Sequence, residues 1–344
     1  MDHSKLAVHP TEFWATTDTI DKINKRKLCL ASKRGDCDGQ IVEAHTIPRS
    51  QLQKIAVDGH VYYIRALPSD LLANDGHYSV GEKGIGQFSV LNLFCAKHDQ
   101  EVFEHIETDE LIFDREQIAL LHYRSMAAEL YKKINAVDAS RYHMQQARKH
   151  GAAEKMEFLK AFEAGNRLGL RDMTRTFSIC ETILRDENYS RISGLVVSFK
   201  KIPTIMTVGG FSPEFDYAGN NLQRLGNSKA TYEQIGVSIL AAQERACVVF
   251  TWITNAIICR QFADSFVAQR SAILTTLAIQ TAFEHLENTC MNIPWWDSLR
   301  PIEREKLLER MQFAGSPFQE RTAACLGYCG ITFDQWEYES HKLI

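Results

Sequence analysis

Four cysteine and histidine residues in the first third of the chain have the side-chain types that bind zinc. Cys29 and Cys37 stand with seven residues between them, and Cys95 and His98 form a Cys-x-x-His pair farther along. Zinc takes four tetrahedral nitrogen and sulfur ligands, and structural sites usually draw them from closely spaced pairs. The first gap is wider than usual, whereas a Cys just before a helix and a His in its first turn can reach one ion. We therefore predict a structural Zn²⁺ site at these four residues.

The stretch between the two pairs contains residues 43–50, Glu-Ala-His-Thr-Ile-Pro-Arg-Ser. It resembles the central motif of the HNH (His-Me finger) endonucleases, in which a two-stranded ribbon carries the His and the next helix carries a metal ligand. The resemblance covers roughly the first third of the chain and implies a treble-clef zinc domain. It implies that His45 is the general base that activates water. It also implies that Asp99 helps to hold a catalytic Mg²⁺ or Mn²⁺ ion and that Asn92 positions the His45 loop.

The chemistry of phosphodiester hydrolysis suits these residue types. Histidine is a base with a pKa near neutrality, and a hard cation on oxygen ligands neutralises the phosphate. The chain departs from the motif in three places. Ala44 stands where many HNH enzymes carry an Asp ligand, Asn92 lies two residues closer to Cys95 than the family Asn, and Asp99 replaces the last family His.

The same residues also have non-catalytic interpretations. His45 is an alternative zinc ligand in place of one of the first two cysteines, and His60 or His77 is an alternative to Cys37. Asp99 in the first turn of a helix also complements the helix macrodipole without any catalysis. These alternatives leave His45 as the discriminating residue, because a histidine that holds zinc cannot act as the base.

Basic residues near the motif are candidates for phosphate contacts. Arg49 lies just after the histidine motif, and Lys33 and Arg34 lie between the two first cysteines within a basic run. The chain as a whole has a net charge of −4, so a nucleic-acid role has to rest on such a local patch. The alternative for each of these residues is an exposed, hydrated side chain with no binding role.

Composition bounds the class of protein. The chain has 344 residues, 45% of them hydrophobic, which is enough for about two globular domains. The first 27 residues are polar, unlike a signal peptide, and no stretch reaches the ~20 apolar residues of a membrane span. Nine scattered cysteines, an odd number, favour a reducing compartment over a disulfide framework. We expect a cytoplasmic protein without a membrane partner.

Hydrophobic patterning predicts an α+β protein in three parts. Residues 1–110 form the small treble-clef zinc domain, residues 111–190 a helical hairpin or spacer, and residues 191–344 a larger domain with an antiparallel sheet and helices. We expect a loop over residues 67–90, four or more strands over 190–256 and one long helix over 263–290. Two helices, separated near Asp138, are expected within 114–186.

Two functions from different classes follow. The first is a metal-dependent endonuclease of HNH type that binds nucleic acid; the resemblance implies a place in bacterial anti-phage defence. The second is a non-catalytic zinc module for nucleic-acid or protein interaction. A protein partner, or a second copy bound through helices 114–186, is plausible for either.

Overall fold

A large antiparallel sheet forms the centre of the protein, which is described here from a computed structural model covering residues 10–227, 229–314 and 320–344. Its eight strands are β2 (His60–Arg65), β3 (Ser79–Gly84), β5 (Ile192–Phe199), β6 (Ile205–Phe211), β7 (Ile235–Ala242), β8 (Arg245–Ile253), β9 (Thr289–Met291) and β10 (Tyr338–Leu343). Their order across the sheet is β10-β5-β8-β7-β6-β9-β2-β3. A separate two-stranded ribbon consists of β1 (Ile41–His45) and β4 (Val90–Cys95).

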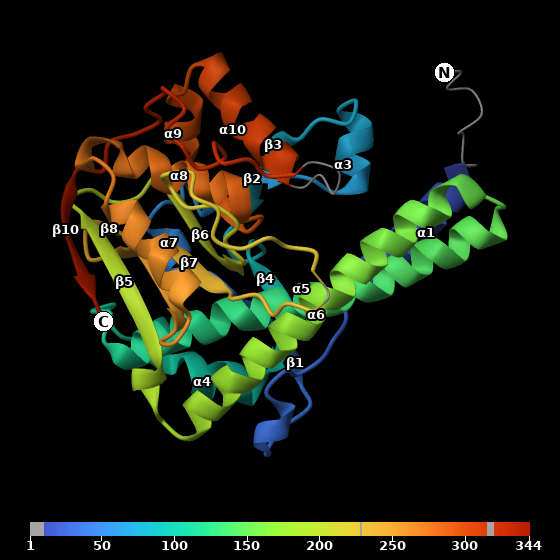
Figure 1. Ribbon diagram of the computed structural model, residues 1–344, viewed down its shortest axis with the longest axis horizontal. Coiled ribbons are helices and arrows are strands. Elements are labelled where there is room, and N and C mark those ends of the chain that lie inside the picture. The colour runs from blue at the N-terminus through green and yellow to red at the C-terminus, as the bar shows by residue number, and fades with distance from the viewer. Residues whose placement is uncertain (1–9, 228, 315–319) are drawn as a thin grey trace.

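Helices cover both faces of the large sheet (Figure 1). They are α1 (Pro10–Asn24), α2 (Arg49–Gln53), α3 (Pro68–Ala73), α4 (Ala96–Glu107), α5 (Arg115–Lys149), α6 (Met156–Arg185), α7 (Ile257–Val267), α8 (Leu274–His285), α9 (Ile293–Ser298) and α10 (Pro301–Ala314). We call the finger the segment 29–37, the β1–β4 ribbon and α4. The helix α5 and the finger pack on one face, and α7 to α10 pack on the other. Because both faces are covered, β7 and β8 are apolar on both sides and almost wholly buried.

The first half of α5 is the element that joins the finger to the sheet. Its residues 117–128 are all buried, because the helix lies between the sheet on one side and α4 and β4 on the other. Glycines let it approach closely: a Cβ added at Gly194 would lie 2.8 Å from Ile118, and one at Gly210 would lie 2.5 Å from Met126. Asp114 caps the start of the helix by accepting from the backbone N–H of Gln117 at 2.8 Å.

The second half of α5 and the first half of α6 form an antiparallel pair that projects from the body, with α1 alongside (Figure 1). The predicted hairpin is therefore confirmed, but its turn lies at residues 150–155 and not near Asp138. Residues 138–149 contain neither Gly nor Pro, so nothing in the sequence interrupts the helix until Gly151, which has φ +66°.

The α+β class and the antiparallel sheet are confirmed, and β5 to β8 occupy the region in which four or more strands were expected. Two local predictions were wrong. Residues 67–90 contain α3 and β3 in addition to loops, and residues 263–290 contain the end of α7, all of α8 and the start of β9 in place of one helix. The proposed boundaries at 110 and 190 remain a prediction about domains, and the large sheet draws strands from both sides of them.

Candidate metal centre

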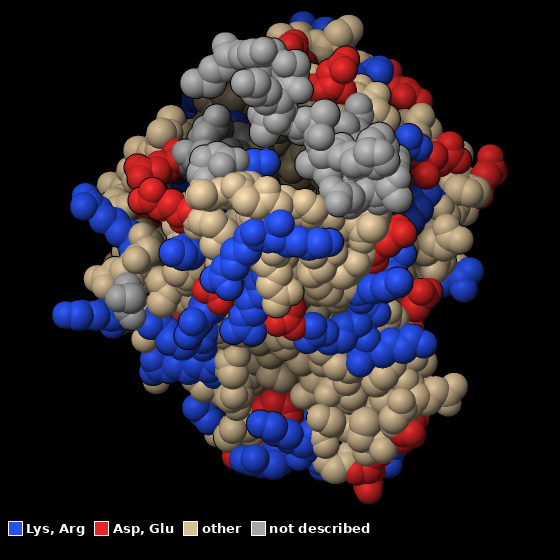
Figure 2. Space-filling view, turned by 90° about the vertical axis from the view of Figure 1, so that its right-hand side faces the viewer, with Lys and Arg blue, Asp and Glu red and all other residues tan. Residues whose placement is uncertain are grey.

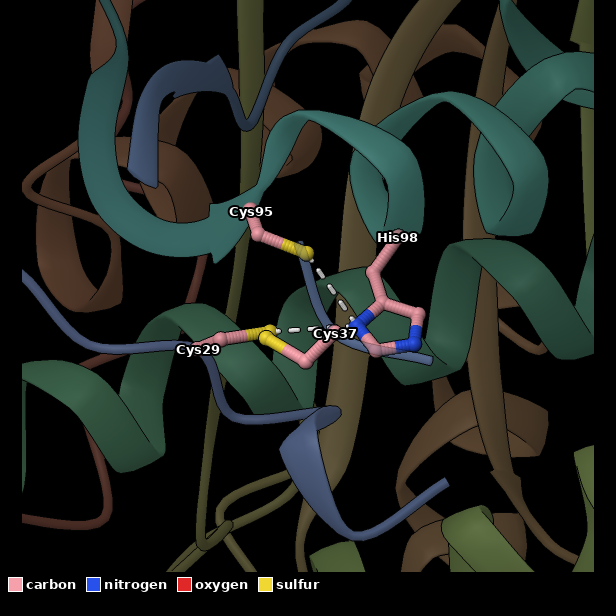
Figure 3. A group of neighbouring side chains, drawn as sticks. All are labelled: Cys29, Cys37, Cys95 and His98. Carbon is pink, nitrogen blue, oxygen red and sulfur yellow. Dashed lines mark hydrogen bonds between the residues drawn. The ribbon is translucent and has the colours of Figure 1, made fainter. Parts of the chain in front are cut away.

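Four side chains converge at the junction of the ribbon and its helix. Cys29 and Cys37 lie on either side of a short 3₁₀ turn (Ser32–Arg34), Cys95 is the last residue of β4, and His98 lies in the first turn of α4. Their ligand atoms all lie within 4.8 Å of one another. Figure 3 shows the Sγ atoms of Cys29 and Cys95 directed at the same ring nitrogen of His98. The predicted group of ligand residues thus comes together in space.

The orientation of His98 shows which of its two ring nitrogens could bind a metal ion. Nδ1 lies 3.3 Å from the Sγ of Cys29 and 3.3 Å from the Sγ of Cys95, while Nε2 lies 3.0 Å from the carbonyl oxygen of Gly35. A protonated Nε2 donates to that carbonyl, which leaves the lone pair of Nδ1 facing the sulfurs. Backbone carbonyls commonly fix metal-binding histidines in this way. Gly35 has φ +89°, a conformation that favours glycine.

The donor set and its spacing fit zinc. In a Cys₃His tetrahedron with ordinary bond lengths, sulfur and nitrogen ligands lie about 3.5 Å apart, close to the 3.3 Å observed. Burial raises the pKa of the Cys29 thiol to about 12, so this sulfur is protonated until a cation displaces the proton. A hydrogen bond from the backbone of Gly39 lowers the pKa of the partly exposed Cys37. Among the described residues this is the one group of three or more His, Cys, Asp or Glu that could hold a metal.

His45 lies outside this group, at the end of β1. Its Nε2 lies 3.1 Å from the carbonyl oxygen of Ile85, in the loop between β3 and β4, and its ring is half-buried. A protonated Nε2 donates to this carbonyl, so Nδ1 carries the lone pair. His60 is also outside the metal group; it is exposed, with Nδ1 2.9 Å from the carbonyl of Asp58. The alternatives in which His45, His60 or His77 replaces a cysteine are therefore not what the structure forms.

Asp99 belongs to a charged cluster between α4 and α5. Burial raises the pKa of its carboxyl group, and the positive charges of Arg124 and, less strongly, of His45 lower it. Arg124 is 2% exposed, lies over the ring of Phe103 at 4.1 Å and donates from Nη2 to the Oε1 of Glu107 at 2.5 Å. Asp99, Phe103 and Glu107 are spaced one turn apart on α4, so they form one face toward α5.

The remaining predicted site residues have the following positions. The amide of Asn92 donates to the backbone carbonyl of Lys25 at 3.0 Å, and so ties the residues before the finger to β4. Arg49 is exposed in the first turn of α2, and Lys33 is exposed on the 3₁₀ turn. Arg34 donates from Nε to the Oε2 of Glu181 at 3.1 Å. The structure therefore leaves Arg49 and Lys33 accessible and engages Arg34 with α6.

A preformed site for a catalytic Mg²⁺ or Mn²⁺ ion does not fit the residues around His45. Ala44 offers no ligand, and the carboxyl group of Asp99 faces the positive charge of Arg124. No second group of three potential ligands occurs among the described residues.

Three positioning groups escaped the sequence analysis. The carbonyl of Ile85 has no sequence signature, because every residue has the same backbone carbonyl whatever its side chain. Arg124 and Glu107 had a weak signature: Arg124 is the one Lys, Arg, Asp or Glu residue in residues 117–128 of α5, and a charged residue in such a segment is buried only with a partner.

No family model, no curated protein and no solved structure matches the chain. Among the helices in the described part of the chain, none is long and apolar enough to cross a membrane.

Proposed function

We propose that the chain is a nucleic-acid-binding protein whose zinc-stabilised finger hydrolyses phosphodiester bonds with His45 as general base. The proposal rests on the position of His45 outside the metal group and on the hydrogen bond of its ring. The four residues of the metal group do not include His45, and its Nε2–H donates a hydrogen bond to the Ile85 carbonyl, which leaves the lone pair on Nδ1. A hydrogen bond at one ring nitrogen fixes the other as the acceptor, which suits a histidine that acts as a general base.

The arrangement of the finger supports the same proposal. Its order is a strand that ends in His45, an antiparallel partner strand, and a helix that begins directly after Cys95. This ribbon-and-helix order is the one that the resemblance to HNH endonucleases implied. Asp99, in the first turn of the helix, is close enough for the charge of His45 to lower its pKa. A carboxylate near a histidine stabilises the imidazolium that forms when the base accepts a proton.

Space and charge for a polyanion lie next to His45. Thr46, the following residue, lines a cavity of about 690 Å³ between the finger and α5. Lys25 and Lys83 line the same cavity, together with Glu43 and Glu287. Lys132 also lines it but is ion-paired with Glu129 at 2.8 Å, so it is not counted among the phosphate contacts. Cationic side chains of this kind bind the phosphate groups of nucleic acids without regard to sequence. In this proposal His45 Nδ1 takes a proton from the attacking water as the water oxygen bonds to phosphorus. The bond from phosphorus to the leaving sugar oxygen breaks, and that oxygen takes a proton from solvent, while lysines bind the phosphate backbone.

A second candidate function is favoured by the cluster around Arg124. The contact of Arg124 with Glu107 and its charge interaction with Asp99 join the finger helix to α5. In a non-catalytic zinc module this cluster would hold the finger on the body, and Asp99 would have a structural role only. The two functions differ in what His45 does, because the module needs no base.

The test is cleavage of supercoiled plasmid and of single-stranded DNA and RNA by the wild type and by His45→Ala, each with Mg²⁺, with Mn²⁺ and with a chelator. The proposal predicts cleavage by the wild type and a loss of about 10²- to 10⁴-fold in His45→Ala, the usual contribution of a general base. Equal rates for the two proteins, or no cleavage by either, would favour the non-catalytic module.

A further inference from the structure

The projecting pair of helices carries a charge opposite to that of the rest of the chain. We call the arm the segment 132–171, which comprises the second half of α5, the turn and the first half of α6. It contains nine Lys and Arg residues and four Asp and Glu residues, a net charge of +5. The whole chain has a net charge of −4, so the remainder carries −9. This separation of charge is far from an even distribution of solvated side chains.

Most of the basic side chains of the arm are free. Five of them are exposed and have no ion-pair partner among the side chains that the structure describes: Arg148, Lys149, Lys155, Lys160 and Arg167. They come from both helices and from the turn between them. Figure 2 looks at this end of the molecule and shows Lys and Arg side chains in a band across it. Unpaired cations on a rigid support keep their charge available for an external anion.

The shape of the arm is suited to an extended polyanion. Helix α5 continues for 18 residues beyond position 131, which is about 27 Å at the rise of an α-helix. The arm also presents an aromatic side chain. Phe162 is 39% exposed and stacks on Phe158 with a distance of 5.9 Å between ring centroids. Exposed aromatic rings among cations are typical of surfaces on which nucleic-acid bases stack.

We propose that the arm is a second nucleic-acid-binding surface, separate from the finger, which holds the phosphate backbone through cations of both helices. Its net charge of +5 disfavours the alternative of a dimer through these helices, because two arms would repel each other. The choice of nucleic acid among polyanions rests on the proposed function of the finger, whereas the binding surface itself does not.

The test uses the cleavage-deficient background His45→Ala, so that binding is measured without cleavage. The arm variant is Arg148→Glu/Lys149→Glu/Lys155→Glu. The matched control, Arg191→Glu/Lys200→Glu/Arg270→Glu, makes the same change in net charge at exposed positions of the body. Binding to a 30-base-pair duplex and to a 30-nucleotide single strand is measured by fluorescence anisotropy at several salt concentrations.

We expect the arm variant to bind about a hundredfold more weakly at 0.1 M salt, with a salt slope reduced by about 3, since each phosphate contact contributes about 0.9 to that slope. The control should change affinity much less. A Phe162→Ala variant should weaken only single-strand binding. Unchanged circular dichroism and thermal midpoints would show that the variants fold.

Three results would overturn the proposal: no binding of nucleic acid by the parent, equal affinities for the arm variant and the control, or a preference for anionic lipid vesicles over nucleic acid. If the arm binds as expected while the wild type cleaves nothing, the arm proposal stands and the nuclease proposal fails. If the wild type cleaves and the arm variant binds like the control, only the arm proposal fails.

Discussion

Replacing Arg124 by Met tests whether the cluster between α4 and α5 holds the finger on the body. The guanidinium is 2% exposed, and the change removes its contacts with Glu107 and Phe103 and its charge from near Asp99. Removing one partner of a buried ion pair costs about 3–5 kcal/mol. Methionine is apolar and fills a similar volume, so the loss of packing is small.

Two features of the structure reduce the expected cost. The side chain of Glu107 is 34% exposed and regains water when Arg124 is lost. The Nε and Nη1 atoms of Arg124 are buried without a hydrogen-bond partner among the described residues. Both belong to one guanidinium group, whose incomplete hydrogen bonding costs about 1–3 kcal/mol that methionine does not incur. We therefore expect Arg124→Met to lower the free energy of unfolding by about 2 kcal/mol.

The assay is urea unfolding followed by hydrogen exchange of the α4 amides, which locates the loss of stability in the finger. The matched control is Arg185→Met, since Arg185 forms an exposed pair with Asp186 at 3.0 Å and its loss should change stability by less than about 1 kcal/mol. A double-mutant cycle with Asp99→Asn measures the coupling between Asp99 and Arg124. The reasoning is refuted if Arg124→Met is as stable as the wild type, or if the cycle shows no coupling.

Three further predictions concern the metal, pH and Asn92. Cys95→Ser should abolish the binding of one zinc ion per chain, measured by mass spectrometry under native conditions, because Cys95 is buried at the centre of the group. Burial raises the pKa of Glu284 and Arg310 lowers it, so Arg310→Met should raise that pKa further. A carboxyl group whose pKa is raised in the folded state lowers stability as the pH increases through that pKa. The variant should therefore lose about 2 kcal/mol of unfolding free energy near pH 7 and much less near pH 4, measured by chemical unfolding. Asn92→Ala should cost about 1 kcal/mol through the lost bond to the Lys25 carbonyl and leave the cleavage rate unchanged; a large drop in rate at unchanged stability would return Asn92 to the catalytic site.

Local features of the sequence were sufficient to predict part of the metal site. Cys95 and His98 are one helical turn apart at the start of a helix, so their convergence follows from the spacing alone. The environment of Asp99 does not follow in this way, because Arg124 lies 25 positions farther along and reaches it only when α5 packs against α4. The contact of His45 with the Ile85 carbonyl is equally nonlocal and involves no side chain that a pattern could reveal.

The fold likewise contains strands that the sequence predicts and a strand that it does not. Apolar and β-branched runs over residues 190–256 predicted the strands that the structure forms as β5 to β8. The three-residue strand β9 is too short to show a period, yet it connects β6 with β2 and so brings the N-terminal strands into the large sheet. The pairing of segments more than 200 residues apart depends on packing that no local pattern contains.

The most direct test of the central claim compares zinc content and cleavage in His45→Ala and His98→Ala, each against the wild type. The account predicts that His45→Ala keeps its zinc and loses cleavage, and that His98→Ala loses its zinc. Loss of zinc from His45→Ala would mean that His45 is a ligand and would remove the base from the proposed mechanism. Full zinc in His98→Ala would contradict the Cys₃His site itself.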